Sequence, residues 1–232
     1  MNKKITGFLC ALAMGASSVL PAAAQDAKVT DRLKDASAVL DEIMATPDKG
    51  IPQSILAGAY CVVVIPAYKK GAFLLGAQYG KGAATCRTPK GWSAPVLVRL
   101  TGGSFGWQIG GQSTDLVMVA MNQNALNHML ANKFKLGADA AASAGPVGRN
   151  AQAGTDWKLN AEFLTYSRSK GLFAGIDLDG TVLSSDDDDM RSEYGSNLPF
   201  NKVLGGQVVT KPNAVHFVHT VAKYFVVSKV NH

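Results

Sequence analysis

The spacing of apolar residues predicts helices near both ends of the chain and in its middle. In the stretch 26–45, five apolar residues recur at intervals of three and four, which places them on one stripe of an amphipathic helix. These residues are Val29, Leu33, Ala36, Leu40 and Ile43. Proline at a first helical position and polar caps mark further helices. The predicted helices are 26–45, 53–59, 122–136, 186–194 and 213–225, the last with Val215, Val218, Ala222 and Phe225 facing inward.

Between these helices, apolar residues fall in short β-branched runs that are typical of strands. Pro66 and the glycines of 69–71 and 80–82 predict turns between runs, and Asp179-Gly180 predicts a hairpin. The predicted strands are 60–65, 72–79, 83–87, 94–100, 116–121, 159–167, 172–178 and 181–184. Many short strands with helices at both ends and one in the middle predict a single α+β domain, built on a mostly antiparallel sheet or barrel.

Glycine and serine are concentrated at the centre of the chain, where they supply seven of the 13 residues 101–113. Phe105, Trp107 and Ile109 alternate with small or polar residues there, which predicts a third strand in this region. Residues two apart share one face of a strand, so we expect these three side chains to face the core together.

The central motifs resemble those of a known family. They are Trp92-Ser93-Ala94-Pro95, Gly102-Gly103-Ser104, Gly106-Trp107-Gln108-Ile109-Gly110 and Ser113-Thr114-Asp115. Together with flanking motifs such as Gly145-Pro146-Val147-Gly148-Arg149 and Tyr166-Ser167-Arg168, they are similar to the SYLF domain family, which includes lipid-binding and actin-binding proteins. The resemblance covers most of the chain, and it assigns 25–232 to a SYLF-like domain.

This resemblance implies recognition of anionic phospholipid headgroups, in which the amphipathic N-terminal helix of the family takes part. Here that helix is 26–45, with Lys28, Arg32 and Lys34 at the headgroups. Acidic residues on the same helix nearly cancel these charges, so the helix could instead simply pack on the core. They are Asp31, Asp35, Asp41 and Glu42. Because some members bind actin filaments, the alternative is a protein-interaction module whose partner is an envelope protein or a second copy of this chain.

The first 24 residues have the pattern of a secretory signal peptide. Lys3 and Lys4 form a positive segment, a mostly apolar run follows, and Ala22-Ala23-Ala24 supplies small residues for cleavage. The alternative is a membrane anchor, but glycine, serine and proline interrupt the run. We therefore expect an exported protein, periplasmic or secreted, that is soluble or peripherally membrane-associated. Removal of the leader lowers the formal net charge from +6 to +4.

Two cysteines, Cys61 and Cys86, lie outside the leader. In an oxidising compartment an even pair favours a disulfide, and the alternative is two buried free thiols.

Basic residues lie at predicted turns and strand ends, interleaved with Tyr68, Tyr79 and Trp92. Cations for phosphates and aromatic rings at the headgroup level are the requirements of an interfacial lipid site. Besides the three on the N-terminal helix, the candidates are Lys69, Lys70, Lys81, Arg87, Lys133, Lys135, Arg149 and Arg168. The alternative is scattered surface lysines. Nucleic acid needs the same cations, but export makes it an unexpected partner.

Two further patterns have weaker chemical content. The carboxylates Asp177, Asp179, Asp186 and Asp187 could hold a cation, or could belong to a solvated hairpin and a helix cap. Gly102-Gly103-Ser104-Phe105-Gly106 matches a serine hydrolase elbow at Ser104, which requires a strand before it and a helix after it. The residues that follow are poor helix formers. No cofactor and no catalysis are expected.

Overall fold

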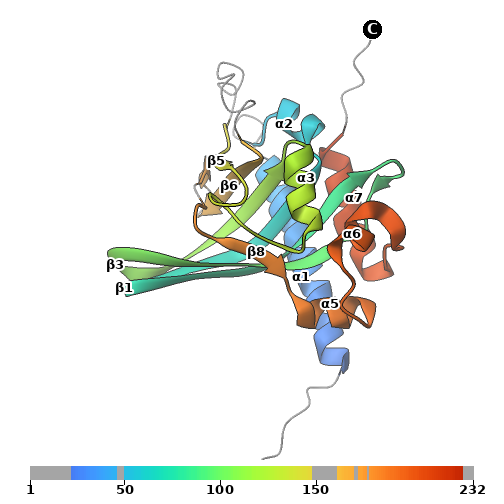
Figure 1. The fold of residues 1–232 in the computed structure, drawn as a ribbon, viewed down its shortest axis with the longest axis horizontal. Coiled ribbons are helices and arrows are strands. Elements are labelled where there is room, and N and C mark those ends of the chain that lie inside the picture. Colours follow the sequence, from blue (N-terminus) through green and yellow to red (C-terminus); the bar gives the residue numbers. More distant parts are fainter. Residues whose placement is uncertain (1–21, 46–49, 148–160, 170–171, 177, 227–232) are drawn as a thin grey trace, which may run out of the picture.

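The computed structural model describes residues 22–45, 50–147, 161–169, 172–176 and 178–226, with the backbone alone for 22–25, 71–76, 104–112 and 173. Its helices are α1 (Ala22–Met44), α2 (Gln53–Gly58), α3 (Gln123–Leu130), α5 (Asp187–Tyr194), α6 (Phe200–Lys202), the π-helix η2 (Val203–Gln207), the 3₁₀ helix η3 (Pro212–Ala214) and α7 (Val215–Tyr224). Helices pack around a strongly curved sheet, as Figure 1 shows.

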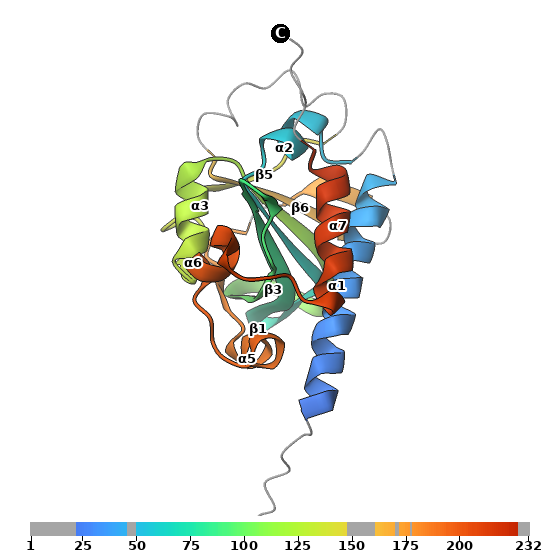
Figure 2. The same ribbon diagram turned by 90° about the vertical axis from the view of Figure 1, so that its right-hand side faces the viewer.

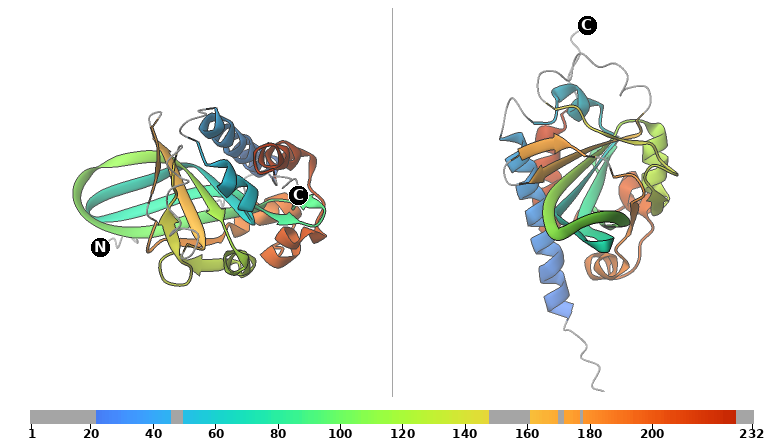
Figure 3. Two further views of the ribbon diagram at one scale, coloured as in Figure 1. Left: turned by 90° about the horizontal axis from the view of Figure 1, so that it is seen from above. Right: turned by 90° about the vertical axis from the view of Figure 1, so that its left-hand side faces the viewer.

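Two long strands organise the sheet. β1 (Cys61–Thr88) and β3 (Val96–Ala120) pair in antiparallel fashion from Cys61↔Ala120 to Ala84↔Val96, and the short β2 (Gly91–Trp92) continues the hairpin beyond them. The middle of this two-stranded ribbon projects from the body of the protein (Figure 1), and both of its ends return to the body (Figure 3). The ribbon is therefore bent into a wide loop.

Strand β1 closes on itself where the loop returns. The amide of Arg87 donates a hydrogen bond of 2.7 Å to the carbonyl of Tyr60, next to the other end of the strand. Cys61 and Cys86 form a buried disulfide at the same junction, with their Cα atoms 3.9 Å apart. The disulfide favoured from the sequence is confirmed.

The shorter strands extend the two halves of β3. β6 (Phe163–Ser169) pairs with one half, and β7 (Leu172–Gly175) pairs with β6. β8 (Val182–Ser185) pairs with the other half and with β4 (Lys133–Lys135). Only β5 (Ala142–Ala144), which pairs with β6, is parallel among the described strands. The result is the predicted α+β fold, with a curled and mostly antiparallel sheet.

Helix α1 packs on β1 by the predicted apolar stripe. Val29, Leu33, Ala36, Leu40 and Ile43 are all at most 2% exposed. The same helix lies beside α7, whereas α3 and α6 lie across the molecule from it, as Figure 2 shows. Among the helices of the described residues, none combines the length and apolar composition that a membrane span requires.

Several predicted turns are wrong, because the chain continues as a strand through all of them. Pro66 does not end its strand; the pairing shifts between Ile65 and Tyr68 instead, and Ala67 takes a left-handed φ of 51°. The amide of Ala67 donates to the Asp115 carboxylate at 3.0 Å, so a bulge accommodates the proline. The glycines of 69–71 and 80–82 also lie within β1.

The predicted Asp179-Gly180 hairpin is also wrong, because the strands on the two sides of the turn do not pair with each other. Gly180 does form a turn, with φ of 83°. However, β7 pairs with β6, and β8 crosses to the opposite half of β3. The long edge of β3 offers backbone partners that the local turn signal does not reveal.

The predicted helix 122–136 is wrong in its second half, where β4 forms instead. Asn122 does cap α3, since its side chain accepts from the amide of Ala125 at 2.9 Å. In β4, Phe134 is buried and its ring stacks on that of Phe163 with centroids 5.1 Å apart. This tertiary contact outweighs the local helical pattern.

In α7 the buried face is Phe217, Thr220 and Val221. The predicted inward residues Val215 and Ala222 are exposed. The buried stripe is therefore rotated about the helix axis from the predicted one, although Phe225, which follows the helix, is buried as predicted.

Candidate functional site

A groove lies between helix α1 and the outer face of β1. Its volume is about 370 Å³. Its lining includes Lys28, Arg32, Pro66, Lys69, Tyr79 and Lys81. The fold thus brings four of the eleven predicted lipid-binding cations to one place, although they are up to 53 positions apart in the sequence.

Two of these cations form the floor of the groove and are ion-paired to two carboxylates, Asp186 at the N-cap of α5 and Asp189 within that helix. Arg32 Nη1 lies 3.1 Å from Asp186 Oδ2, and Lys81 Nζ lies 2.6 Å from the same oxygen. Lys81 also lies 3.2 Å from Asp189, and Arg32 forms an ion pair with Asp189. Both carboxylates are at most 6% exposed, so this four-residue ionic cluster joins α1, β1 and α5 inside the protein.

The cluster shifts the pKa values of three of its members. Burial, and then the hydrogen bond and charge of Asp189, raise the pKa of Asp186. Burial opposes the ionisation of Asp189 too, but the hydrogen bond with Asp186 and the charges of Arg32 and Lys81 outweigh it and lower its pKa. Burial likewise opposes the charge on Lys81, yet the two carboxylates raise its pKa above the ordinary value, so it stays protonated.

The rim of the groove is more open to water. Lys28 and Lys69 are exposed, and Tyr79 is 44% exposed beside them. Asp31 and Asp35 also line the groove and reduce its positive charge. The groove is thus a fixed ionic floor under two accessible ammonium groups and an accessible phenol.

The other predicted cations are distributed elsewhere. Arg87 donates to the carbonyls of Ala59 at 3.0 Å and Phe225 at 2.9 Å, and it stacks on Trp92 at 4.7 Å, so it is a structural anchor. Arg168 forms ion pairs with Asp115 and Glu42. Lys34, Lys133 and Lys135 are exposed outside the groove, Lys70 lines a different pocket, and Arg149 lies outside the described residues.

The three described carboxylates of the predicted acidic cation site lie in different surroundings. Asp186 is ion-paired as above, Asp187 is exposed in the first turn of α5, Asp179 is exposed at the β8 turn, and Asp177 lies outside the described residues. Within the described part of the chain, no group of three or more acidic, histidine or cysteine side chains could hold a metal ion. The acidic run supplies partners to Arg32 and Lys81 instead, a pairing that only the fold reveals.

Ser104 does not lie at a nucleophile elbow. Its backbone pairs with Gly76 inside the continuous strand β3, and no helix follows it directly. The side chains of Phe105, Trp107 and Ile109 lie outside the described residues, so their predicted core placement stays a prediction.

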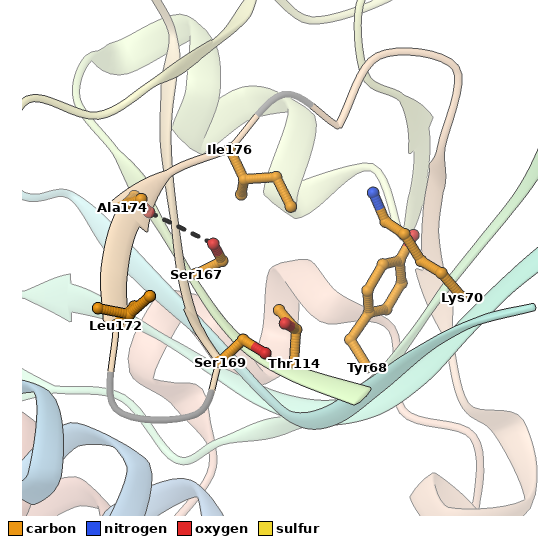
Figure 4. A pocket seen from close by; sticks show the side chains of 8 residues that line it. All are labelled: Tyr68, Lys70, Thr114, Ser167, Ser169, Leu172, Ala174 and Ile176. Atoms are coloured by element: carbon orange, nitrogen blue, oxygen red, sulfur yellow. Dashed lines mark hydrogen bonds between the residues drawn. The ribbon is translucent and has the colours of Figure 1, made fainter. Parts of the chain in front are cut away.

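A second pocket, on the inner face of the curved sheet, was not predicted. Its volume is about 290 Å³, and Figure 4 shows its lining side chains. They include Tyr68, Lys70, Thr114, Ser167, Leu172 and Ile176. Alternation along β1 separates the two cavities, since Ala67 and Lys69 line the outer groove while Tyr68 and Lys70 line the inner pocket. The strand at 68–70 was not predicted, because Lys69-Lys70-Gly71 indicates a turn in the sequence.

Comparison with known proteins places the chain among relatives of yeast and animals. Residues 101–224 match the family described as Ysc84, Las17-binding protein actin regulator. An SH3 domain-containing protein of Schizosaccharomyces pombe is 38% identical over 163 residues, which are 68% of this chain and 37% of the relative. SH3 domain-containing YSC84-like protein 1 of Rattus norvegicus is 34% identical over 164 residues, 70% of this chain and 48% of the relative.

LAS seventeen-binding protein 3 of Saccharomyces cerevisiae is 32% identical over 169 residues, 71% of this chain and 37% of the relative. The chain therefore spans less than half of the length of each of these three relatives.

Proposed function

Because the chain belongs to the Ysc84 (SYLF) family, we propose that it is an exported, non-enzymatic protein that binds anionic phospholipid headgroups at a membrane surface. The observation that carries this proposal is the groove between α1 and β1, where Lys28, Lys69 and Tyr79 converge above the ionic cluster.

The ionic cluster gives the groove a fixed floor. Arg32 and Lys81 are each held by two carboxylates, so the segments of α1 and β1 that carry the rim lysines are tied together. Preorganised donors lose less conformational entropy on binding than donors on a mobile segment. The backbone positions that carry the two rim lysines are therefore held close together on the surface.

The balance of charge sets the expected strength of binding. Asp31 and Asp35 offset the two rim lysines, so the groove has no large excess of positive charge. Each lysine near an anionic membrane surface contributes about 1 kcal/mol. We expect binding that is modest, needs anionic lipid, and weakens with salt because exposed charges are screened. An exposed tyrosine at the rim suits the headgroup level of a bilayer.

A protein partner is the second candidate, and the names of the relatives favour it. The matching family is described as Las17-binding and as an actin regulator, and one yeast relative is named for binding LAS seventeen. For an exported chain, the corresponding partner is an envelope protein. The same exposed groove would then meet acidic side chains in place of phosphates.

Flotation with liposomes tests the lipid proposal. The chain without its leader is mixed with vesicles of phosphatidylcholine alone or with added phosphatidylglycerol, at low and at high salt. We expect flotation only with the anionic vesicles, and its loss at high salt. Absence of binding at low salt would remove the lipid proposal, and specific capture of one envelope protein in a parallel pull-down would then support the second candidate.

A further inference from the structure

The inner pocket lies on the face of β1 opposite the groove. We propose that it holds the single hydrocarbon chain of an anionic amphiphile, such as a fatty acid or a single-chain phosphate ester, with the anionic head at Lys70.

The walls of the pocket are suited to a hydrocarbon chain. Leu172, Ala174 and Ile176 supply its apolar side, and the ring of Tyr68 lies across from them (Figure 4). Leu172 is 73% exposed, an unusual state for a leucine on a strand, and it marks the mouth of the pocket. A chain that enters there covers apolar surface that water now contacts.

The hydroxyl groups of the pocket are partly taken up by the protein. Tyr68 Oη donates to Gln78 Oε1 at 2.6 Å, and Ser167 Oγ donates to the carbonyl of Ala174 at 3.4 Å. Burial raises the pKa of the Tyr68 phenol, so that ring stays neutral. These two hydroxyl groups need no hydrogen bond from a ligand, because an apolar chain in the pocket leaves each of them with its partner in the protein.

Lys70 supplies the charge that gives the pocket its polarity. It is the only charged side chain among the described residues that line the pocket. Its Nζ lies 6.0 Å from the centroid of the Tyr68 ring, which is itself buried. A lysine beside an apolar wall is the arrangement that recognises an anionic head on a hydrocarbon tail.

The size of the pocket limits the ligand to one chain. Its volume of about 290 Å³ lies at the lower end of the range for small-molecule sites. A phospholipid with two acyl chains exceeds it. Because Lys69 and Lys70 point to opposite faces of β1, a lipid held at the groove does not reach the pocket through the sheet.

A fluorescent fatty acid tests this site directly. cis-Parinaric acid, a single unbranched chain whose emission rises in apolar surroundings, is titrated into the protein, and decanoic acid, decyl phosphate and decyltrimethylammonium are added as competitors. Lys70→Gln should weaken probe binding about tenfold, since a hydrogen bond to a charged group is lost. Lys69→Gln is the matched control, one residue away on the other face, and should bind like the parent.

Ala174→Phe fills the pocket and should abolish the probe signal. Leu172→Asp, at an exposed position, should do the same by placing a negative charge at the mouth, and it decides the matter if Ala174→Phe does not fold. Competition by decanoic acid or decyl phosphate identifies the preferred head. Equal weakening by Lys69→Gln and Lys70→Gln, unchanged binding in both pocket variants, or equal competition by decyltrimethylammonium would each overturn the proposal. Lys70→Gln, Ala174→Phe and Leu172→Asp leave both rim lysines of the groove unchanged, so liposome flotation of these three variants reports on the groove independently.

Discussion

The amide of Arg87, near the end of β1, donates a hydrogen bond of 2.7 Å to the carbonyl of Tyr60, which directly precedes the start of the same strand. This contact makes β1 return on itself and bends the ribbon that it forms with β3. The bend gives the ribbon an outer face and an inner face. The outer face carries the groove with α1, and the inner face carries the pocket. Both candidate sites therefore depend on the closure of β1.

Gly82 is required for that closure. A Cβ at this position would collide with the carbonyl oxygen of Val64 and lie 2.9 Å from the Cα of Ile65, both on the opposite half of β1. These are backbone atoms that cannot rotate away. We expect Gly82→Ala to lower the free energy of unfolding by about 3 kcal/mol or more, the upper range for overpacking, as measured by urea denaturation.

Gly103 provides the control for this experiment, since a Cβ there meets nothing within 4 Å. Gly103→Ala should leave the free energy of unfolding unchanged or raise it slightly, because alanine restricts the unfolded chain. Equal destabilisation by the two substitutions would contradict the close packing of the two halves of β1.

The Cys61–Cys86 disulfide should stabilise the same junction. It joins residues 25 apart in sequence, and the chain-entropy model assigns about 3 kcal/mol to a loop of that length. We expect Cys61→Ala/Cys86→Ala to lower the free energy of unfolding by that amount and to unfold at a lower urea concentration. The mean residue ellipticity of the folded variant should equal that of the parent. Alkylation of two thiols in protein isolated without reductant would show that the bond does not form.

The ionic cluster predicts a pH-dependent effect of Arg32→Ala. At pH 7, removing Arg32 leaves two buried carboxylates with Lys81 alone, and we expect a loss of about 3 kcal/mol of stability. The pKa of Asp189 is lowered in the folded protein, so its contribution is complete above the unfolded value of about 3.9 and is lost as pH falls through the lower folded value.

The raised pKa of Asp186 acts in the opposite direction, because its ionisation costs stability as pH rises through that value. Without Arg32 this cost grows. The deficit of Arg32→Ala relative to the parent should therefore begin to shrink as pH falls through the raised pKa of Asp186, above the unfolded value of about 3.9, and shrink further as Asp189 is protonated. Lys34→Ala, which removes an exposed lysine 4.0 Å from Asp31 on the same helix, should show little deficit at any pH. A stability deficit of Arg32→Ala that does not vary with pH would mean that the packing of the aliphatic part of this side chain, and not its charge, stabilises the protein.

Arg87→Lys tests whether this residue is an anchor. Lysine keeps the positive charge but cannot donate in the same fork to the carbonyls of Ala59 and Phe225 while it stacks on Trp92. We expect a loss of about 1–2 kcal/mol of stability and unchanged liposome binding. Reduced liposome binding at unchanged melting temperature would indicate instead that Arg87 contacts lipid.

The fold class and the N-terminal helix could be predicted from the sequence because their signals are local. The stripe from Val29 to Ile43 needs only the helical period, and all of its residues are buried as predicted. The length of β1 could not be predicted, because Pro66 and the glycines near 70 and 80 are turn signals in isolation. Here a bulge absorbs the proline, and Gly80 and Gly82 are needed for close packing between strand halves.

The candidate sites were predictable in part. Four of the basic residues singled out from the sequence come together at the groove, but the partners of two of them lie far away in sequence. Nothing local indicates that Asp186 and Asp189 pair with Arg32 and Lys81, more than 100 positions distant. The inner pocket was missed because its residues are ordinary strand residues until β1 bends, and only then do Lys70 and Leu172 line one cavity.

The central claim is that the groove binds anionic lipid, and a charge reversal at its rim tests it most directly. Lys28→Glu/Lys69→Glu is compared with Lys133→Glu/Lys135→Glu, which changes the net charge equally at exposed lysines on β4. Flotation with phosphatidylglycerol vesicles at low salt should fall at least about tenfold for the groove variant, given about 1 kcal/mol for each lysine at an anionic surface, and should persist for the β4 variant. Equal flotation of both variants, or an equal loss in both, would contradict the assignment of lipid binding to this groove.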